Sequence, residues 1–305
     1  MDRTLLKRDW LTESVILALP SMSTIISKDT QKKADRSYTS RRAANWNKAS
    51  LKCGQGIRLG MIDGSVDTKH PTFKGSNLKY RSFHLKGQTA GAIRHGTAVA
   101  NVMIGNWRWG GLLPKANLFA ANVFHKRKKG KSRASTKSVL LAINWLTKLR
   151  VDVINFSIGG SYNSLIAHAI EKAHKSGIIL IASAGNSEPF TKKKSYPAAY
   201  KQAVAIAASD RFNRTAKFSS AGSYVEFTAP GVRIWTAVPG GGRAMSGTSF
   251  SAPIVSSLVA AALKTEGIQD LESVRGYLRS HAKDRGKEGW DKYTGWGIVG
   301  IKPLC

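Results

Sequence analysis

The chain has few acidic residues, few cysteines and no long apolar stretch. Each of these features limits the class of protein to which it can belong. Among its 305 residues are 18 aspartates and glutamates against 48 lysines and arginines, a formal net charge of +30. Such an excess of positive charge attracts polyanions or acidic surfaces, but it does not identify a particular partner. No apolar run approaches the ~20 residues that a membrane-spanning helix needs, which predicts a chain without a transmembrane segment. The 42% of hydrophobic residues suffice for a large folded core.

The two cysteines, Cys53 and Cys305, are too few for a disulfide framework. One bridge that joins the beginning of the core to its end would fit their positions. A free pair is the interpretation that we favour, because the sequence does not reveal the compartment.

The first 43 residues predict a basic extension that precedes the body of the protein. Its apolar stretch is interrupted at residues 12–14, so it matches a secretory signal poorly. The spacing of Leu6, Trp10 and Leu17 favours a surface helix, and a polar, basic linker follows it. We therefore divide the chain into an extension, residues 1–43, and a single folded domain, residues 44–305.

Within this domain, short apolar runs alternate with helical patterns. Continuous apolar strands that alternate with helices indicate a mainly parallel sheet with helices on both faces, the doubly wound α/β class. In such sheets the functional residues gather at the carboxyl ends of the strands. The predicted strands are 57–62, 117–123, 151–156, 178–183 and 203–207, and the predicted helices are 95–104, 136–149 and 161–175.

A segment of small residues, 245–253, precedes an apolar run and predicts a tight turn that opens a helix. Gly247 permits a sharp bend, and Ser249 then falls in the first turn, where free backbone N–H groups favour developing negative charge. We also place Pro253 in this first turn, where a missing N–H costs little. Ser249 is a candidate nucleophile, although a helix start that only packs explains the segment equally well.

Two further residues at predicted element boundaries favour the catalytic interpretation. Asp63 ends the first apolar strand, where it would be rigid and partly desolvated, as suits an acid that orients a histidine. His95 opens a helix beside Gly96, which leaves its ring approachable. An acid, a base and a nucleophile are therefore all expected at one edge of the sheet.

These motifs, Met-Ile-Asp-Gly, His-Gly-Thr and Gly-Thr-Ser-Phe-Ser-Ala-Pro, stand in the order Asp, His, Ser, and the chain resembles the subtilisin-like serine proteases, or subtilases. The resemblance covers about residues 44 to 302. It implies a serine endopeptidase in which Ser249 attacks, His95 acts as general base and then acid, and Asp63 fixes the imidazole tautomer. Asn186 matches the family's oxyanion-binding asparagine; without the resemblance we would place it in an ordinary Gly-Asn turn.

The resemblance also implies a substrate-binding strand end at Ser157, Ile158 and Gly159, which would pair with an extended peptide and line the first specificity pocket. Calcium is a frequent family ligand, but Thr72 stands where an aspartate ligand is usual, so we expect no high-affinity site and no other metal. Fewer than fifty residues precede the body, which is too few for the folded inhibitory pro-region of many relatives.

Two basic runs are expected beside the substrate cleft, at residues 125–133 and 192–194. They predict an electropositive cleft that prefers peptides with Asp or Glu near the cut; solvated loop charges are an equally good explanation. The alternatives to an active protease are a pseudoprotease and a basic module that binds nucleic acid or anionic surfaces. We expect no nucleic-acid partner, because basic runs and aromatics are not interleaved. We further expect a monomer, and the family favours a secreted or cell-envelope location.

Overall fold

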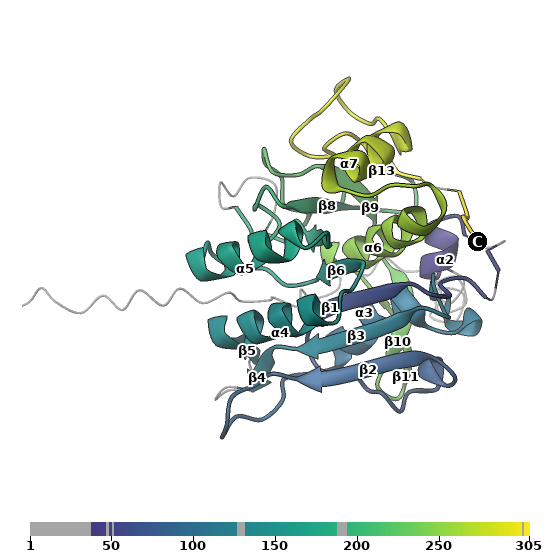
Figure 1. The fold of residues 1–305 in the computed structure, drawn as a ribbon. Helices are drawn as coiled ribbons and strands as arrows, with labels where there is room; N and C mark the ends of the chain where they lie inside the picture. Colours follow the sequence, from purple (N-terminus) through teal and green to yellow (C-terminus); the bar gives the residue numbers. More distant parts are fainter. Residues whose placement is uncertain (1–37, 47–48, 51, 127–131, 188–193, 301) are drawn as a thin grey trace, which may run out of the picture.

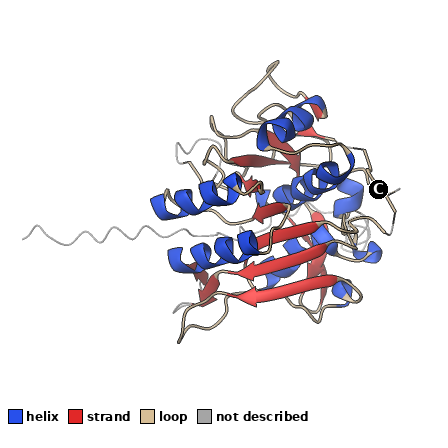
Figure 2. Ribbon diagram, viewed as in Figure 1, coloured by secondary structure: helices blue, strands red, loops and turns tan. Residues whose placement is uncertain are grey.

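A computed structural model of the chain describes residues 38–46, 49–50, 52–126, 132–187, 194–300 and 302–305. The predicted N-terminal helix and the tips of both basic runs lie outside this part. At the centre is a nine-stranded sheet in the order β12-β13-β9-β8-β7-β6-β1-β3-β2, whose neighbours are parallel except for the pair β12–β13 (Figures 1 and 2). Its strands are β1 Arg58–Asp63, β2 Asn77–Ser82, β3 Asn117–Asn122, β6 Val153–Phe156, β7 Ile179–Ser183, β8 Ala203–Ser209, β9 Phe227–Pro230, β12 Ala282–Lys283 and β13 Ile298–Val299.

Two antiparallel hairpins lie outside the sheet, and helices cover both of its faces. The hairpins are β4 Phe124–Lys126 with β5 Ser132–Ala134 and β10 Ile234–Val238 with β11 Gly241–Met245. The α-helices are α2 Ser40–Ala43, α3 Ile93–Ile104, α4 Thr136–Lys148, α5 Ser164–Lys175, α6 Thr248–Thr265 and α7 Leu271–Ser280; Pro71–Phe73 and Trp107–Trp109 form short 3₁₀ turns. No helix among the described residues is long and apolar enough to cross a membrane.

The alternation of side chains along β1 explains the layers. Leu59 and Met61 point into a core that they share with α3 and α6, whereas Ile62 points into a second core, shared with α4 and α5. Burying both faces of a strand requires the near-continuous apolar sequence from which these strands were predicted. The predicted doubly wound α/β fold is confirmed.

The start of α6 follows the prediction in one respect and differs from it in another. Gly247 caps the helix at φ +153°, a conformation that favours glycine. Pro253, however, lies five residues beyond Thr248, where α6 begins, and so not in the first turn as predicted. At that depth proline removes a helical hydrogen bond, the one that would end on the carbonyl of Ser249.

The cysteines correct a second expectation. Cys53 and Cys305 form a disulfide with a Cα–Cα distance of 5.2 Å, within the usual range, so the free pair that we favoured is wrong. Cys53 is buried in the turn before β1, and the backbone N–H of Ser50 donates to the Cys305 carbonyl. The bridge fixes the last residues of the sequence beside the beginning of the body. Local sequence could not reveal this pairing, because 252 positions separate the two residues.

Residues 38–46 pack on the body of the protein. Ser40 Oγ and the Arg41 N–H both donate to the carbonyl of Gly110, and the Trp235 N–H donates to the carbonyl of Tyr38. Ser40 and Arg41 are buried. The boundary predicted between residues 43 and 44 thus falls within a docked segment.

Candidate active site

The candidate site forms where neighbouring parallel strands end. Asp63 is the last residue of β1, Ser157 follows β6, and Asn186 follows β7 by three residues. The strands β1, β6 and β7 are adjacent in the sheet, and α3 and α6 begin at the same edge. Residues separated by more than a hundred positions therefore meet because the carboxyl ends of parallel strands share one edge.

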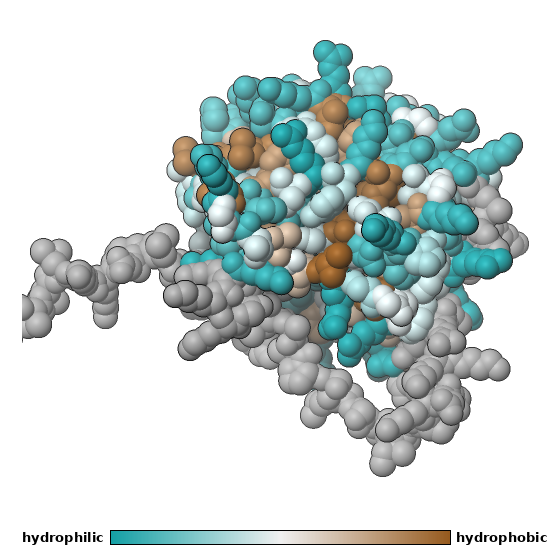
Figure 3. All heavy atoms as spheres, turned by 90° about the horizontal axis from the view of Figure 1, so that it is seen from below, coloured by the Kyte–Doolittle hydropathy of each residue, from teal (hydrophilic) through white to brown (hydrophobic). Residues whose placement is uncertain are grey.

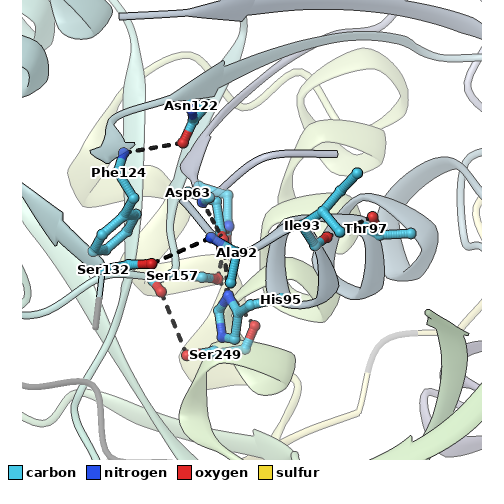
Figure 4. A network of polar contacts seen from close by, with 12 residues as sticks. Asp63, Ala92, Ile93, His95, Thr97, Asn122, Phe124, Ser132, Ser157 and Ser249 are labelled. Atoms are coloured by element: carbon cyan, nitrogen blue, oxygen red, sulfur yellow. Dashed lines mark hydrogen bonds and ion pairs between the residues drawn. The ribbon is translucent and has the colours of Figure 1, made fainter. Parts of the chain in front are cut away.

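Asp63 and His95 form the central pair of the site. His95 Nδ1 lies 2.8 Å from Asp63 Oδ1, and Asp63 is 1% exposed (Figure 4). The backbone N–H of Gly64 donates to the same oxygen, whereas Oδ2 is buried without a hydrogen-bond partner among the described residues. The carboxylate therefore concentrates its interaction on one imidazole nitrogen and directs the other nitrogen, Nε2, away from itself.

Charge and burial act in opposite directions on the histidine. Burial lowers the pKa of His95, but the negative charge of Asp63 and its hydrogen bond outweigh that effect, so the pKa lies above its ordinary value. Such a pair stabilises the imidazolium that forms when the histidine accepts a proton. The ring of Phe250, 5.7 Å from the imidazole between centroids, packs beside it from α6.

Ser249 lies in the first turn of α6, on the side of His95 away from Asp63 (Figure 4). It is 7% exposed, and its hydroxyl donates a long hydrogen bond of 3.4 Å to the carbonyl of Ser157. Hydrogen bonds of catalytic groups are often long in unliganded enzymes and tighten when substrate binds. The structure thus places the three predicted residues close to one another, with the Ser249 hydroxyl directed to the carbonyl of Ser157 (Figure 4).

Asn186 faces the same helix start. Its amide oxygen accepts hydrogen bonds from the backbone N–H and the hydroxyl of Thr248, both at 3.0 Å. This leaves the amide nitrogen to point past Gly247, where an added β-carbon would lie 3.3 Å from it. Thr248, which orients Asn186, was not among the residues predicted from the sequence. Amide N–H₂ groups and the N–H groups of a helix start are donors of the kind that bind oxyanions.

The three residues predicted to bind substrate begin beside this helix start, where Ser157 Oγ donates to the carbonyl of Ser249. Ser157 and Ile158 are buried. Gly159 lies so close to the loop after β7 that an added β-carbon would be 2.8 Å from Ser195 Oγ. The following residue, Gly160, forms an antiparallel bridge with Tyr196. The bridge fixes the end of this segment against the loop after β7.

Thr72, which stands where a calcium-binding aspartate is usual in the family, takes part in a hydrogen-bond network. Thr72 is fully buried, and its hydroxyl donates to the side-chain oxygen of Asn101. Asn101 Nδ2 donates in turn to Thr236 Oγ1 and to the carbonyl of Trp109. The Thr72 hydroxyl is therefore part of a buried hydrogen-bond network with Asn101 and Thr236.

The sequence of the chain is similar to those of known proteins. Residues 54–297 match the family model described as the subtilase family. The chain belongs to this family. Subtilisin-like protease 5 of Arthroderma otae is 35% identical over 223 residues, which cover 70% of this chain and 54% of that protein. Subtilisin DY of Bacillus licheniformis is 30% identical over 260 residues, which cover 82% and 90%.

The likeness extends to solved structures. The structure described as S41 Psychrophilic Protease superposes with a TM-score of 0.73 at 29% identity and covers 87% of this subtilase and 97% of that chain. The chain spans about half the length of the fungal relatives it matches, but nearly all of Subtilisin DY.

Proposed function

We propose that the protein is a serine endopeptidase that hydrolyses peptide bonds through an acyl-enzyme on Ser249. The observation that carries the proposal is the pairing of Asp63 with His95 at 2.8 Å beside the helix start that holds Ser249. A serine hydroxyl is a poor nucleophile until a base accepts its proton. The arrangement supplies that base and the acid that orients it.

The reaction runs in two balanced halves. His95 Nε2 takes the proton of Ser249 Oγ while the oxygen bonds to the scissile carbonyl carbon. The Asn186 amide and the Ser249 N–H donate to the resulting oxyanion. The imidazolium then protonates the leaving amine as the C–N bond breaks. Water repeats the sequence with His95 as base, which releases the acid product and restores Ser249.

We further propose that the substrate-binding cleft is electropositive and prefers peptides with acidic residues near the cut. Residues 68–151, which include α3 and the hairpin β4–β5, contain 17 lysines and arginines and no aspartate or glutamate. Three exposed cations lie near the proposed cleft: Arg94 next to His95, Lys126 on the hairpin, and Lys194 after β7. The side of the molecule where β2 and the hairpin lie presents a mostly hydrophilic surface (Figure 3).

Peptide-library digestion tests the cleft. We expect enrichment of Asp and Glu on the amino side of the cut, with a rate that falls as salt rises, because salt screens exposed charges. Arg94→Gln should reduce the enrichment, and Lys283→Gln, which neutralises an exposed cation on β12, serves as the control. A profile without acidic preference would refute the electropositive cleft and leave the peptidase intact.

We also propose that the protein acts outside the reducing cytosol. Disulfides persist in oxidising compartments, and Cys53 and Cys305 are paired. Alkylation of protein from its native source before and after reduction tests this proposal. Two thiols that react only after reduction would support it; two thiols that react without reduction would refute it.

A further inference from the structure

Pro253 deprives the carbonyl of Ser249 of its ordinary helical partner. In an α-helix this oxygen would accept from the N–H four residues later, but that residue is Pro253. Instead Ser157 Oγ, from the strand end after β6, donates to it at 2.9 Å. A side chain of the sheet thus takes the place of a helical hydrogen bond in the turn that carries the nucleophile.

A chain of buried polar groups stands behind Ser157. Asn155 Nδ2 donates to Ser157 Oγ at 2.9 Å, and Ser256 Oγ donates to Asn155 Oδ1 at 3.2 Å. All three side chains are no more than 1% exposed. We call Ser256, Asn155 and Ser157 the buried chain.

The three hydrogen bonds of the buried chain run in one direction. Ser256 donates to Asn155, Asn155 donates to Ser157, and Ser157 donates to Ser249. The order fixes the amide orientation of Asn155, since its oxygen faces one hydroxyl and its nitrogen the other. Cooperative bonds in a buried, low-dielectric setting hold their geometry more tightly than isolated ones.

The buried chain links α6 to β6 at two points, through Ser256 in its third turn and through Ser249 in its first. Hydrogen bonds at two positions along a helix restrict both its rotation about its axis and its distance from the sheet. A bond at one position holds only that position. The Ser249 hydroxyl and N–H depend on that placement, because the first must face His95 and the second the oxyanion. An error of about 1 Å at such groups costs on the order of a hundredfold in rate.

We propose that the buried chain positions Ser249 by occupying the carbonyl that Pro253 leaves without a helical partner, so that Asn155, Ser157 and Ser256 are positioning residues for acylation. This inference rests on the proposed peptidase function. Neither Asn155 nor Ser256 touches the reacting atoms, and their effect is transmitted through the Ser249 carbonyl.

The first test compares two neighbouring serines. Ser256→Ala breaks the buried chain, whereas Ser257→Ala removes an equally buried hydroxyl that donates only to Pro253 O within α6. The readouts are Tm and the limiting rate and half-saturation concentration of phosphonylation by a fluorophosphonate. We expect Ser256→Ala to lower the limiting rate about three- to tenfold with half-saturation unchanged. Ser257→Ala should lower Tm comparably and leave the rate unchanged.

A double-mutant cycle tests the role of the proline. Ser157→Ala should lower the limiting rate by about ten- to a hundredfold. In a Pro253→Ala background residue 253 regains its N–H, which bonds to the Ser249 carbonyl, so the same change should cost less. Independent, multiplicative effects would refute the proposal, as would equal rates for Ser256→Ala and Ser257→Ala. Wild-type protein that resists phosphonylation would refute the peptidase function itself and this inference with it.

Discussion

At the scale of single residues, the charge of Asp63 decides at which pH His95 can act. The base must be neutral to accept a proton, and Asp63 raises the pKa of His95 against the opposing effect of burial. The acid limb of the pH–rate profile therefore reports this pair.

Asp63→Asn should shift that acid limb to lower pH and lower kcat by about 10⁴-fold, because the wrong tautomer is then favoured. The wild-type pair also stabilises the fold below the unfolded pKa of His95, and this stabilisation is lost as pH rises through the raised folded pKa. Relative to the wild type, Asp63→Asn should therefore lose more unfolding free energy at acid pH than at basic pH. Rate profiles and denaturant unfolding between pH 5 and 9 measure both effects; an unmoved acid limb would contradict the assignment of the pair.

Asn186→Ala should lower kcat by about 10²- to 10³-fold with little change in KM, because in the proposed mechanism its amide binds the oxyanion and not the ground-state substrate. Steady-state kinetics on one peptide substrate measure the split. A rise in KM at constant kcat would instead make Asn186 a substrate-binding residue.

At the scale of helices and strands, the sequence predicted those elements whose pattern is locally distinctive. Five apolar strands and three helices appear within three residues of the predicted bounds. Strand β2 was missed because it lies at the edge of the sheet, where polar and apolar residues alternate and no continuous apolar run forms. The motifs predicted Asp63, His95 and Ser249 as site residues, but the buried chain joins residues about a hundred positions apart that no local pattern connects.

The hydrogen bonds around Thr72 lead to a prediction at this scale. We propose that the hydrogen bonds of Thr72 and the docked residues Ser40 and Arg41 stabilise this region without a cation. Thr72→Val should cost about 1–3 kcal/mol of unfolding free energy, because it leaves the Asn101 oxygen buried and unsatisfied. A chelator should leave the wild-type Tm unchanged. A fall in Tm on chelation that added calcium reverses would contradict this proposal.

At the scale of the whole molecule, the disulfide closes a loop of 252 residues. Cross-linking distant positions restricts the unfolded chain, so reduction should lower the unfolding free energy by about 2–5 kcal/mol. Thermal unfolding with and without a reductant measures the effect, and the Cys53→Ala/Cys305→Ala variant, which should ignore the reductant, is the control. An equal loss of Tm in both proteins would show that the reductant acts elsewhere.

The charge of +30 is also a property of the whole molecule, since its acid-free segment, residues 68–151, contributes both His95 and the hairpin beside the proposed cleft. Charge alone does not separate a basic protease from a basic binding module. The covalent chemistry of Ser249 does, because only a protein with an assembled triad activates that hydroxyl.

The most direct measurement is therefore the mass of the protein after treatment with a fluorophosphonate, followed by peptide mapping of the modified residue. We expect one adduct per molecule on Ser249, formed at a rate that falls sharply in His95→Ala, and no adduct in Ser249→Ala. Folded wild-type protein that remains unmodified, or an adduct that persists in Ser249→Ala, would contradict it.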